Sequence, residues 1–205
     1  MKCFPAVAML VVTVGTVLSA QTTYEIDPAH SSAEFSIKHM MVSNVRGELG
    51  KVTGTIVYDP ANLSASSVQA SIDATGITTR DAGRDKDLKS PHFFEVSKYP
   101  TITFRSTQLV EVAGKLQVKG NLTIHGVTRP VVLAIDGPSP DTKDPWGNFR
   151  RGATATTSLN RKDYGLVWNK TLDGGGVLVG DEVAITLDVE GVRKQGTSTG
   201  SVAVR

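Results

Sequence analysis

The four histidines are the residues of this chain best suited to hold a metal ion or to transfer a proton. They are His30, His39, His92 and His125, they stand far apart, and none forms an HxH or HxxxH pair. Short spacings of that kind supply the ligands of many protein zinc sites. We therefore expect no metal site. The alternative roles are hydrogen bonding to backbone groups or lining the interior as polar spots.

Nucleophilic catalysis has few candidate residues. The only cysteine, Cys3, precedes an apolar run that is typical of an export signal, so removal of that signal leaves no thiol in the mature chain. We expect a protein that is not an enzyme. Because catalytic groups are assembled in space and not only in sequence, an enzyme acting on an isoprenoid or quinone lipid remains the alternative, with His39 or His125 as its base.

Three arginines could recognise a phosphate. The guanidinium group matches phosphate oxygens with two parallel hydrogen bonds, so Arg46, Arg129 and Arg161 are candidates to bind a pyrophosphate head group. The alternative for each is structural pairing with an acidic residue on a neighbouring strand.

The amino-terminal residues 1–20 have the pattern of a cleavable signal peptide. Lys2 precedes an apolar run from Phe4 to Leu18, and Ala20 supplies the small residue for cleavage. No cysteine follows the run, so we expect no lipid anchor, no stable membrane anchor and a periplasmic location. Residues 21–192 then form one domain, and residues 193–205 form a polar tail that we expect to be disordered. The net charge of +2 gives no reason to expect nucleic-acid binding.

The chain between these segments alternates apolar and polar residues, which is typical of half-buried β-strands. The alternation is clear at 32–39, 67–74, 102–104, 116–124 and 183–190, and weaker at 51–58, 131–135 and 152–159. About eight antiparallel strands of this kind form either a sandwich or a closed barrel. Two segments, Met40–Val45 and Asp81–Lys89, are predicted to be short helices.

In a closed barrel, the apolar face of each strand points into the lumen. The candidates for contact with a ligand there, together with residues near the second predicted helix, are Phe35, Ile37, His39, Val52, Ile56, Ile72, Leu88, Phe93, Phe94, Ile102, Phe104, Leu116, Val118, Leu122, Ile185 and Leu187. Some of these side chains must instead close the ends of the barrel. Phe93 and Phe94 have that alternative role, as core beside the helix.

Several blocks of the sequence resemble one known family. They are Tyr24–Ser31, Phe35–His39, Val45–Gly47, Thr79–Phe94, Tyr99–Phe104, Gly120–Pro130, Asn160–Gly165 and Val179–Val183. In this order they resemble the YceI-like lipid/polyisoprenoid-binding family. The resemblance implies an all-β fold, an extended eight-stranded antiparallel β-barrel that is lipocalin-like, with one or two short helices near an opening. It also implies an elongated apolar lumen, a periplasmic location and a possible homodimer.

The expected function is non-catalytic binding, sequestration or transport of a polyisoprenoid, an isoprenoid quinone or a fatty-acyl chain, with no cofactor besides such a lipid. A ligand-free structural or stress-response protein is a further alternative. Asp87 and His92 depart from the family pattern, because the histidine and the acidic residue have exchanged positions. If the two side chains touch, the exchange preserves their contact.

Overall fold

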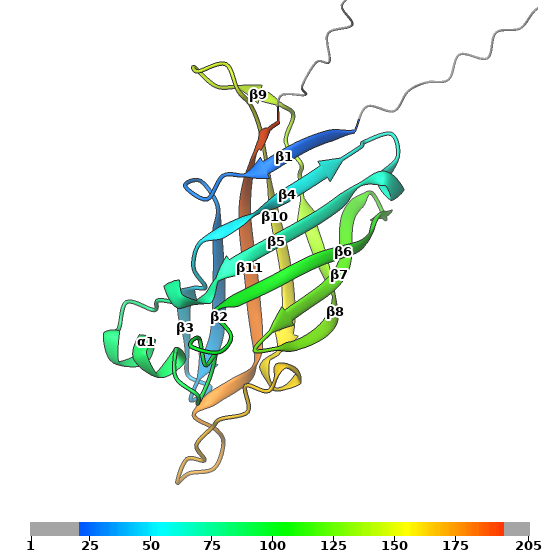
Figure 1. Cartoon of the computed structure of the whole chain (residues 1–205). Helices are drawn as coiled ribbons and strands as arrows, with labels where there is room; N and C mark the ends of the chain where they lie inside the picture. The colour runs from blue at the N-terminus through cyan, green and yellow to red at the C-terminus, as the bar shows by residue number, and fades with distance from the viewer. Residues whose placement is uncertain (1–20, 195–205) are drawn as a thin grey trace, which may run out of the picture.

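The computed structural model describes residues 21–194, which form a β-barrel with one α-helix at one end (Figure 1). The predicted signal peptide and most of the predicted tail lie outside the described residues. The strands are β1 (Thr22–Ile26), β2 (Ser32–His39), β3 (Ser43–Glu48), β4 (Val52–Tyr58), β5 (Ser67–Asp73), β6 (Thr101–Val112), β7 (Lys115–Ile124), β8 (Val127–Asp136), β9 (Thr142–Lys143), β10 (Phe149–Asn160) and β11 (Val179–Arg193). The helices are α1 (Ala82–Leu88) and three single 3₁₀ turns, η1 (Leu63–Ala65), η2 (Ala74–Gly76) and η3 (Arg161–Tyr164).

The sheet closes on itself through eight strands in the order β11–β1–β4–β5–β6–β7–β8–β10–β11, all pairs being antiparallel. One edge of β11 pairs with β10, and the opposite edge pairs with two strands. Its residues Gly191–Arg193 pair with β1, and Val179–Asp188 pair with β2. The hairpin of β2 and β3 thus extends the wall of the barrel at the end where α1 lies. The predicted eight-stranded antiparallel barrel is confirmed.

All the predicted strands are present, whereas β1, β3 and β9 were not predicted. The prediction of a helix over Met40–Val45 is wrong. Met40 and Met41 take left-handed φ angles of 51° and 62°, and β3 begins at Ser43. Two consecutive residues with positive φ make a tight turn between antiparallel strands and cannot continue a right-handed helix.

The second predicted helix is α1, and local hydrogen bonds explain where it begins. Asp81 caps it by accepting a hydrogen bond from the backbone N–H of Arg84 at 2.9 Å. One turn later, the Asp85 carboxylate accepts hydrogen bonds from the backbone and the hydroxyl of Thr79, both at 2.6 Å, and these bonds lower the pKa of Asp85. The helix is therefore fixed to the loop that precedes it.

The seam between β8 and β10 is the shortest pairing among the long strands of the barrel. Only Ala134, Ile135 and Asp136 of β8 pair with β10, whereas β10 pairs with β11 from Arg150 to Asn160. Beyond the last pair the two strands diverge. There, the Nε atom of Arg129 on β8 donates a hydrogen bond to the backbone oxygen of Asp163 at 3.2 Å, so a side chain connects β8 to η3.

The end of the barrel at α1 is filled by side chains. Residues from β2, from the loops around α1 and from the segment after η3 form one buried cluster that includes Phe35, Ile77, Phe93, Tyr164 and Leu166. The close packing needs a glycine. A Cβ on Gly47 of β3 would lie 2.7 Å from Cε1 of Phe35, which is too close for any side chain. We call these five residues the plugged end, since other members of the same cluster, among them Val52, Ile72 and Ile102, line the hollow part of the barrel.

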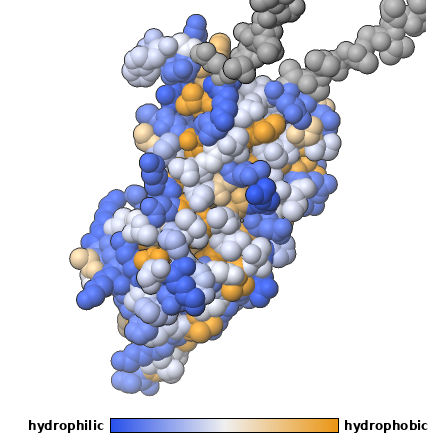
Figure 2. Space-filling view, viewed as in Figure 1, coloured by the Kyte–Doolittle hydropathy of each residue, from blue (hydrophilic) through white to orange (hydrophobic). Residues whose placement is uncertain are grey.

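The outer surface has the polar character expected for the other face of an alternating sheet. Figure 2 shows hydrophilic residues over much of one side of the molecule, with hydrophobic residues among them. No helix in residues 21–194 is long and apolar enough to cross a membrane.

Candidate ligand-binding cavity

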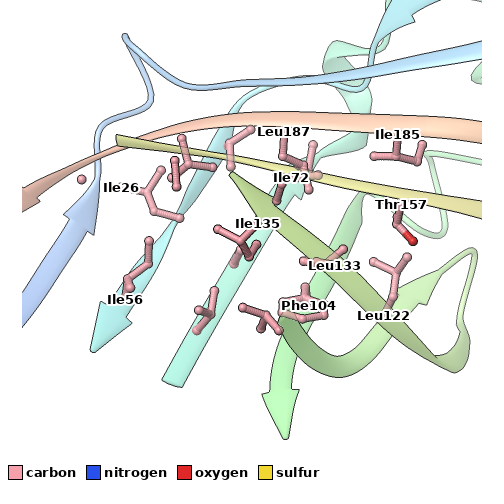
Figure 3. Close-up of a pocket in the computed structure, with 18 of the residues that line it drawn as sticks. Ile26, Ile56, Ile72, Phe104, Leu122, Leu133, Ile135, Thr157, Ile185 and Leu187 are labelled. Carbon is pink, nitrogen blue, oxygen red and sulfur yellow. The ribbon is translucent and has the colours of Figure 1, made fainter. Parts of the chain in front are cut away.

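The middle of the barrel is hollow. The cavity has a volume of about 170 Å³, roughly ten times the space that one water molecule requires. Figure 3 shows side chains from several strands that point into it, mostly carbon, with the Thr157 hydroxyl among them. The lining side chains that are polar or charged are Tyr24, Tyr58, Arg151 and Thr157; the rest are aliphatic residues, Phe104, alanines, glycines and Pro138.

The burial of the inward residues agrees with a hollow interior. Ile56, Leu122, Ile185 and Leu187 point into the barrel, yet each is only half-buried. A packed core would bury such residues almost completely. Each of these side chains packs against buried neighbours on one side and faces the cavity on the other.

One glycine shapes the cavity wall. Gly120 on β7 lies on the inward face, and a Cβ there would lie 2.5 Å from Cζ of Phe104 on β6. The ring of Phe104 thus lies over the glycine, against the wall, where a side chain would otherwise push it toward the lumen.

Ten of the sixteen lumen candidates line the cavity: Val52, Ile56, Ile72, Ile102, Phe104, Leu116, Val118, Leu122, Ile185 and Leu187. Their contact with a ligand remains a prediction.

The other six candidates lie away from the cavity. Phe35 and Phe93 are buried in the plugged end, and Ile37, Leu88 and Phe94 pack against that cluster. His39 is half-buried at the last position of β2, next to the hairpin turn. Phe35 and Ile37 of β2 point inward as predicted, but their side chains contact the cluster of the plugged end and do not line the cavity.

The sequence analysis missed the polar residues at the end of the cavity farthest from α1. Tyr24 of β1, Tyr58 of β4 and Arg151 of β10 all line the cavity there. A signal was present for Arg151, because Ala153, Ala155, Thr157 and Leu159 follow it at every second position and all line the cavity. The same parity places Arg151 inward.

Arg151 lies between two aromatic rings and next to a carboxylate. Its Cζ atom is 5.7 Å from the ring centroid of Tyr24 and 5.3 Å from that of Tyr58, within the range of a cation–π interaction. Its Nε atom donates a hydrogen bond to Oδ1 of Asp141 at 3.2 Å. The hydroxyl of Tyr24 donates to the same oxygen at 2.8 Å, and Arg193 bonds the other oxygen of Asp141.

None of the three predicted head-group arginines lines the cavity. Arg46 is exposed on β3, and Arg129 is exposed on β8, where it bonds the Asp163 backbone. Arg161 is buried and donates hydrogen bonds to the backbone oxygens of Gly180 at 2.8 Å and Trp168 at 2.9 Å, and also to that of Leu166. Burial lowers its pKa. This pattern ties the segment after η3 to β11.

The histidines are dispersed in the structure as they are in the sequence, and none lines the cavity. His125 packs edge-on against Tyr99, with ring centroids 4.5 Å apart, and its Nε2 is 3.5 Å from Oε2 of Glu95. His92 stacks near Trp168, and its Nδ1 is 2.9 Å from Oδ1 of Asp87. The exchanged residues Asp87 and His92 are therefore in contact.

Among the described residues, one group brings a histidine together with two carboxylates, namely His30, Asp27 and Glu190. A cation already lies among them. Arg150 Nη1 is 2.8 Å from Oδ2 of Asp27 and 2.5 Å from Oε1 of Glu190, and Arg150 Nε is 2.8 Å from Oδ2 of Asp144. Arg150 lowers the pKa of Asp144 to about 2 and holds the pKa of Asp27 well below its usual range. We call this set the Arg150 network.

A closed antiparallel barrel with a hollow, apolar interior is the architecture of proteins that hold a small molecule inside a sheet. The model of the YceI-like domain matches residues 24–191. The chain belongs to the YceI-like family.

Individual relatives extend the comparison. The chain is 42% identical over 146 residues to a UPF0312 protein of Vibrio cholerae, covering 70% of this chain and 77% of that protein. Among solved structures, it is similar to Burkholderia cenocepacia BcnA, with a TM-score of 0.68 and 22% identity over 80% of this chain and 98% of that one. It is also similar to a polyisoprenoid-binding domain from Saccharophagus degradans implicated in plant cell wall breakdown, with a TM-score of 0.60 and 14% identity, over 83% and 98% of the two chains. The likeness to these two structures concerns the fold.

Proposed function

We propose that this protein binds the chain of a long apolar lipid in the lumen of its barrel and does no chemistry on it. The observation that carries the proposal is the hollow, aliphatic interior between β4 and β11. An apolar void is costly in a folded protein, because the lining side chains lose both burial and van der Waals contacts. A ligand of matching polarity restores both.

The hydrophobic effect is strong enough to hold such a ligand. Each buried CH₂ group contributes about 0.8 kcal/mol, so one five-carbon isoprene unit contributes roughly 3–4 kcal/mol. A bound lipid must therefore bury several such units to exceed the cost of association, which is about 4–15 kcal/mol. Polyisoprenoids, isoprenoid quinones and fatty-acyl chains all meet this requirement, and selectivity then depends on chain length and branching. The fold shared with a polyisoprenoid-binding domain supports the same class of ligand.

The lining supports binding without catalysis. Among the lining residues of the described chain there is no histidine, cysteine, serine, lysine or carboxylate, and these are the groups that most often act as nucleophile, acid or base. A G-x-S-x-G pattern, which carries a nucleophilic serine in some hydrolases, occurs at Gly196–Gly200. It lies outside the described residues.

The location that fits this role is the periplasm, where an exported carrier could sequester a lipid or transfer it through water. The predicted signal peptide in residues 1–20 supports the location. Amino-terminal sequencing of the protein from its native host tests it, and we expect the mature chain to begin at Gln21.

The test of binding is direct. The protein is purified from its native host, extracted with organic solvent, and the extract is analysed by mass spectrometry. The delipidated protein is then titrated with prenyl and acyl lipids of increasing length. We expect a co-purified lipid and an affinity that rises with chain length.

Two neighbouring valines of β8 provide a matched pair of variants. Val131 lines the cavity, whereas Val132 is exposed on the outer face. Val131→Phe places a ring in the lumen, so we expect it to weaken lipid binding at least tenfold with little change in stability. Val132→Phe should change neither.

The proposal fails if no lipid co-purifies and none binds in titration. A ligand-free structural protein with a collapsed interior would instead be destabilised by Val131→Phe by about 1–3 kcal/mol, because overpacking strains a filled core.

A further inference from the structure

Arg151 is the one charged side chain among the lining residues of the described cavity. Its side chain is 22% exposed, so it is only partly buried. A charged side chain beside an apolar cavity needs hydrogen-bond or ion-pair partners, because the cation loses part of its hydration there. What surrounds Arg151 therefore decides whether its charge is already satisfied.

Most of the N–H donors of Arg151 make no hydrogen bond within the described part of the chain. A guanidinium group carries five N–H donors, and the Nε–H of Arg151 is used on Asp141. Within residues 21–194, neither terminal nitrogen of Arg151 makes a hydrogen bond, and neither does the hydroxyl of Tyr58 beside it. These donors are available to an acceptor in the cavity.

Taken alone, the group of Arg151, Asp141 and Arg193 carries a positive charge. Asp141 is the carboxylate that pairs with Arg151, but it pairs with Arg193 as well. One negative charge is thus shared by two guanidinium groups. The other carboxylates nearby, Glu25, Asp27, Asp144 and Glu190, pair with Lys194 and Arg150, and none of them forms an ion pair with Arg151. Within ion-pair distance, Arg151 and Arg193 therefore share the single carboxylate of Asp141.

We propose that this group binds an oxyanion head, a carboxylate or a phosphate, on the ligand whose apolar chain fills the lumen. The proposal rests on the proposed function, since it assigns an orientation to that ligand. The head lies between Tyr24 and Tyr58 against Arg151, and the tail points toward Ile124 and the plugged end. Guanidinium nitrogens grip such a head with paired, charge-assisted hydrogen bonds.

The competing explanation is that Arg151 only clamps the end of the barrel. An arginine with that role would donate most of its hydrogen bonds to other residues of the protein, whereas only the Nε atom of Arg151 does so. The substitution Arg151→Met distinguishes the two roles. Methionine keeps an unbranched apolar side chain between the two rings, and Arg193 still pairs with Asp141, so no buried carboxylate is left alone.

The experiment compares acids with their neutral alcohols. Delipidated full chain, either wild type or Arg151→Met, is titrated with tetradecanoate, tetradecan-1-ol, farnesyl diphosphate and farnesol. Arg46→Met, which removes an exposed arginine away from the cavity, is the control. We expect Arg151→Met to weaken binding of the anionic ligands about tenfold or more, to leave the alcohols within twofold, and Arg46→Met to change nothing.

The outcomes separate this inference from the proposed function. If Arg151→Met loses affinity for tetradecanoate alone, the site prefers a carboxylate head. If it loses affinity for farnesyl diphosphate alone, the site prefers a phosphate, and both results support the inference. If Arg151→Met weakens the binding of acids and alcohols equally, or changes the binding of neither, the inference is overturned while the proposed lipid binding stands. If the wild type binds none of the four ligands, the proposed function fails as well.

Discussion

At the α1 end of the barrel, inward-pointing side chains touch one another, whereas in the middle, side chains of the same kind face a void. The strands alone do not explain this difference, because apolar residues alternate along both. The plugged end receives extra side chains from outside the barrel wall, such as Ile77, Phe93 and Tyr164. The hollow part receives fewer: Leu49 and Pro138 from loops line it, and Leu63 of η1 packs beside its lining. Loops and the helix, more than the strands, thus determine which part of the lumen stays empty.

This contrast predicts different costs for the same truncation in the two regions. Ile77 is fully buried in the plugged end, and Ile56 is a half-buried cavity residue. We expect Ile77→Ala to lower the free energy of unfolding by about 4 kcal/mol, because it opens a new cavity. Ile56→Ala should cost about 1.5 kcal/mol, because it only enlarges an existing one. Chemical denaturation of the delipidated protein measures both, and equal costs would mean that the two regions are packed alike.

The next largest effect concerns Arg161, which holds the segment after η3 against β11. Arg161→Met leaves the backbone oxygens of Gly180, Leu166 and Trp168 without their donor. We expect a loss of about 3 kcal/mol in unfolding free energy, with lipid affinity of the folded protein retained. Arg46→Met should stay within about 0.5 kcal/mol, since its side chain is exposed. A normal stability of Arg161→Met would contradict this role.

Acid should weaken the end with the Arg150 network more than the end at α1, because the large pKa shifts lie at Asp27 and Asp144 and a smaller one at Asp85. The folded-state pKa values of Asp27 and Asp144 lie below their usual value near 4. Their contribution to stability is therefore complete above pH about 4 and is lost as the pH falls through the folded-state values. Hydrogen exchange should show that β1 loses protection between pH about 4 and 2, and that Arg150→Met removes this dependence. A uniform loss over the whole barrel would show that the two ends respond together.

The smallest effect is expected at the pair of Asp87 and His92, where both side chains are largely exposed. Exposed ion pairs contribute about 0.5 kcal/mol. A double-mutant cycle with Asp87→Ala and His92→Ala should give a coupling energy of that size, with no change in lipid binding. A coupling above about 2 kcal/mol would assign the pair a larger part in fixing α1.

Alternation in the sequence was sufficient to predict the strands and the residues that point inward, because side chains change face at every residue along a strand. It could not predict the height of a residue along the barrel. Phe35 and Ile37 were for this reason assigned to the lumen, although β2 lies against the plugged end. Arg151 was missed because the predicted strand began one residue later, at Gly152.

Turn and contact geometry were harder to predict than the strands. Nothing in the composition of Met40–Val45 indicates that two methionines accept left-handed backbone angles, and the hairpin pairing imposes them. The partners of Arg161 also come from three separate segments. Their convergence depends on the tertiary fold and leaves no trace in local spacing.

The short pairing between β8 and β10 affects how far the barrel can widen. Past Ala134, the wall on this side is held by the Arg129 side chain, which can rotate, and not by a ladder of backbone hydrogen bonds. Strands β8 and β10 can move apart there without breaking any backbone hydrogen bond between them. If the barrel binds a bulky, methyl-branched lipid as proposed, we expect the sheet to widen between β8 and β10, while the other strand pairs keep their register.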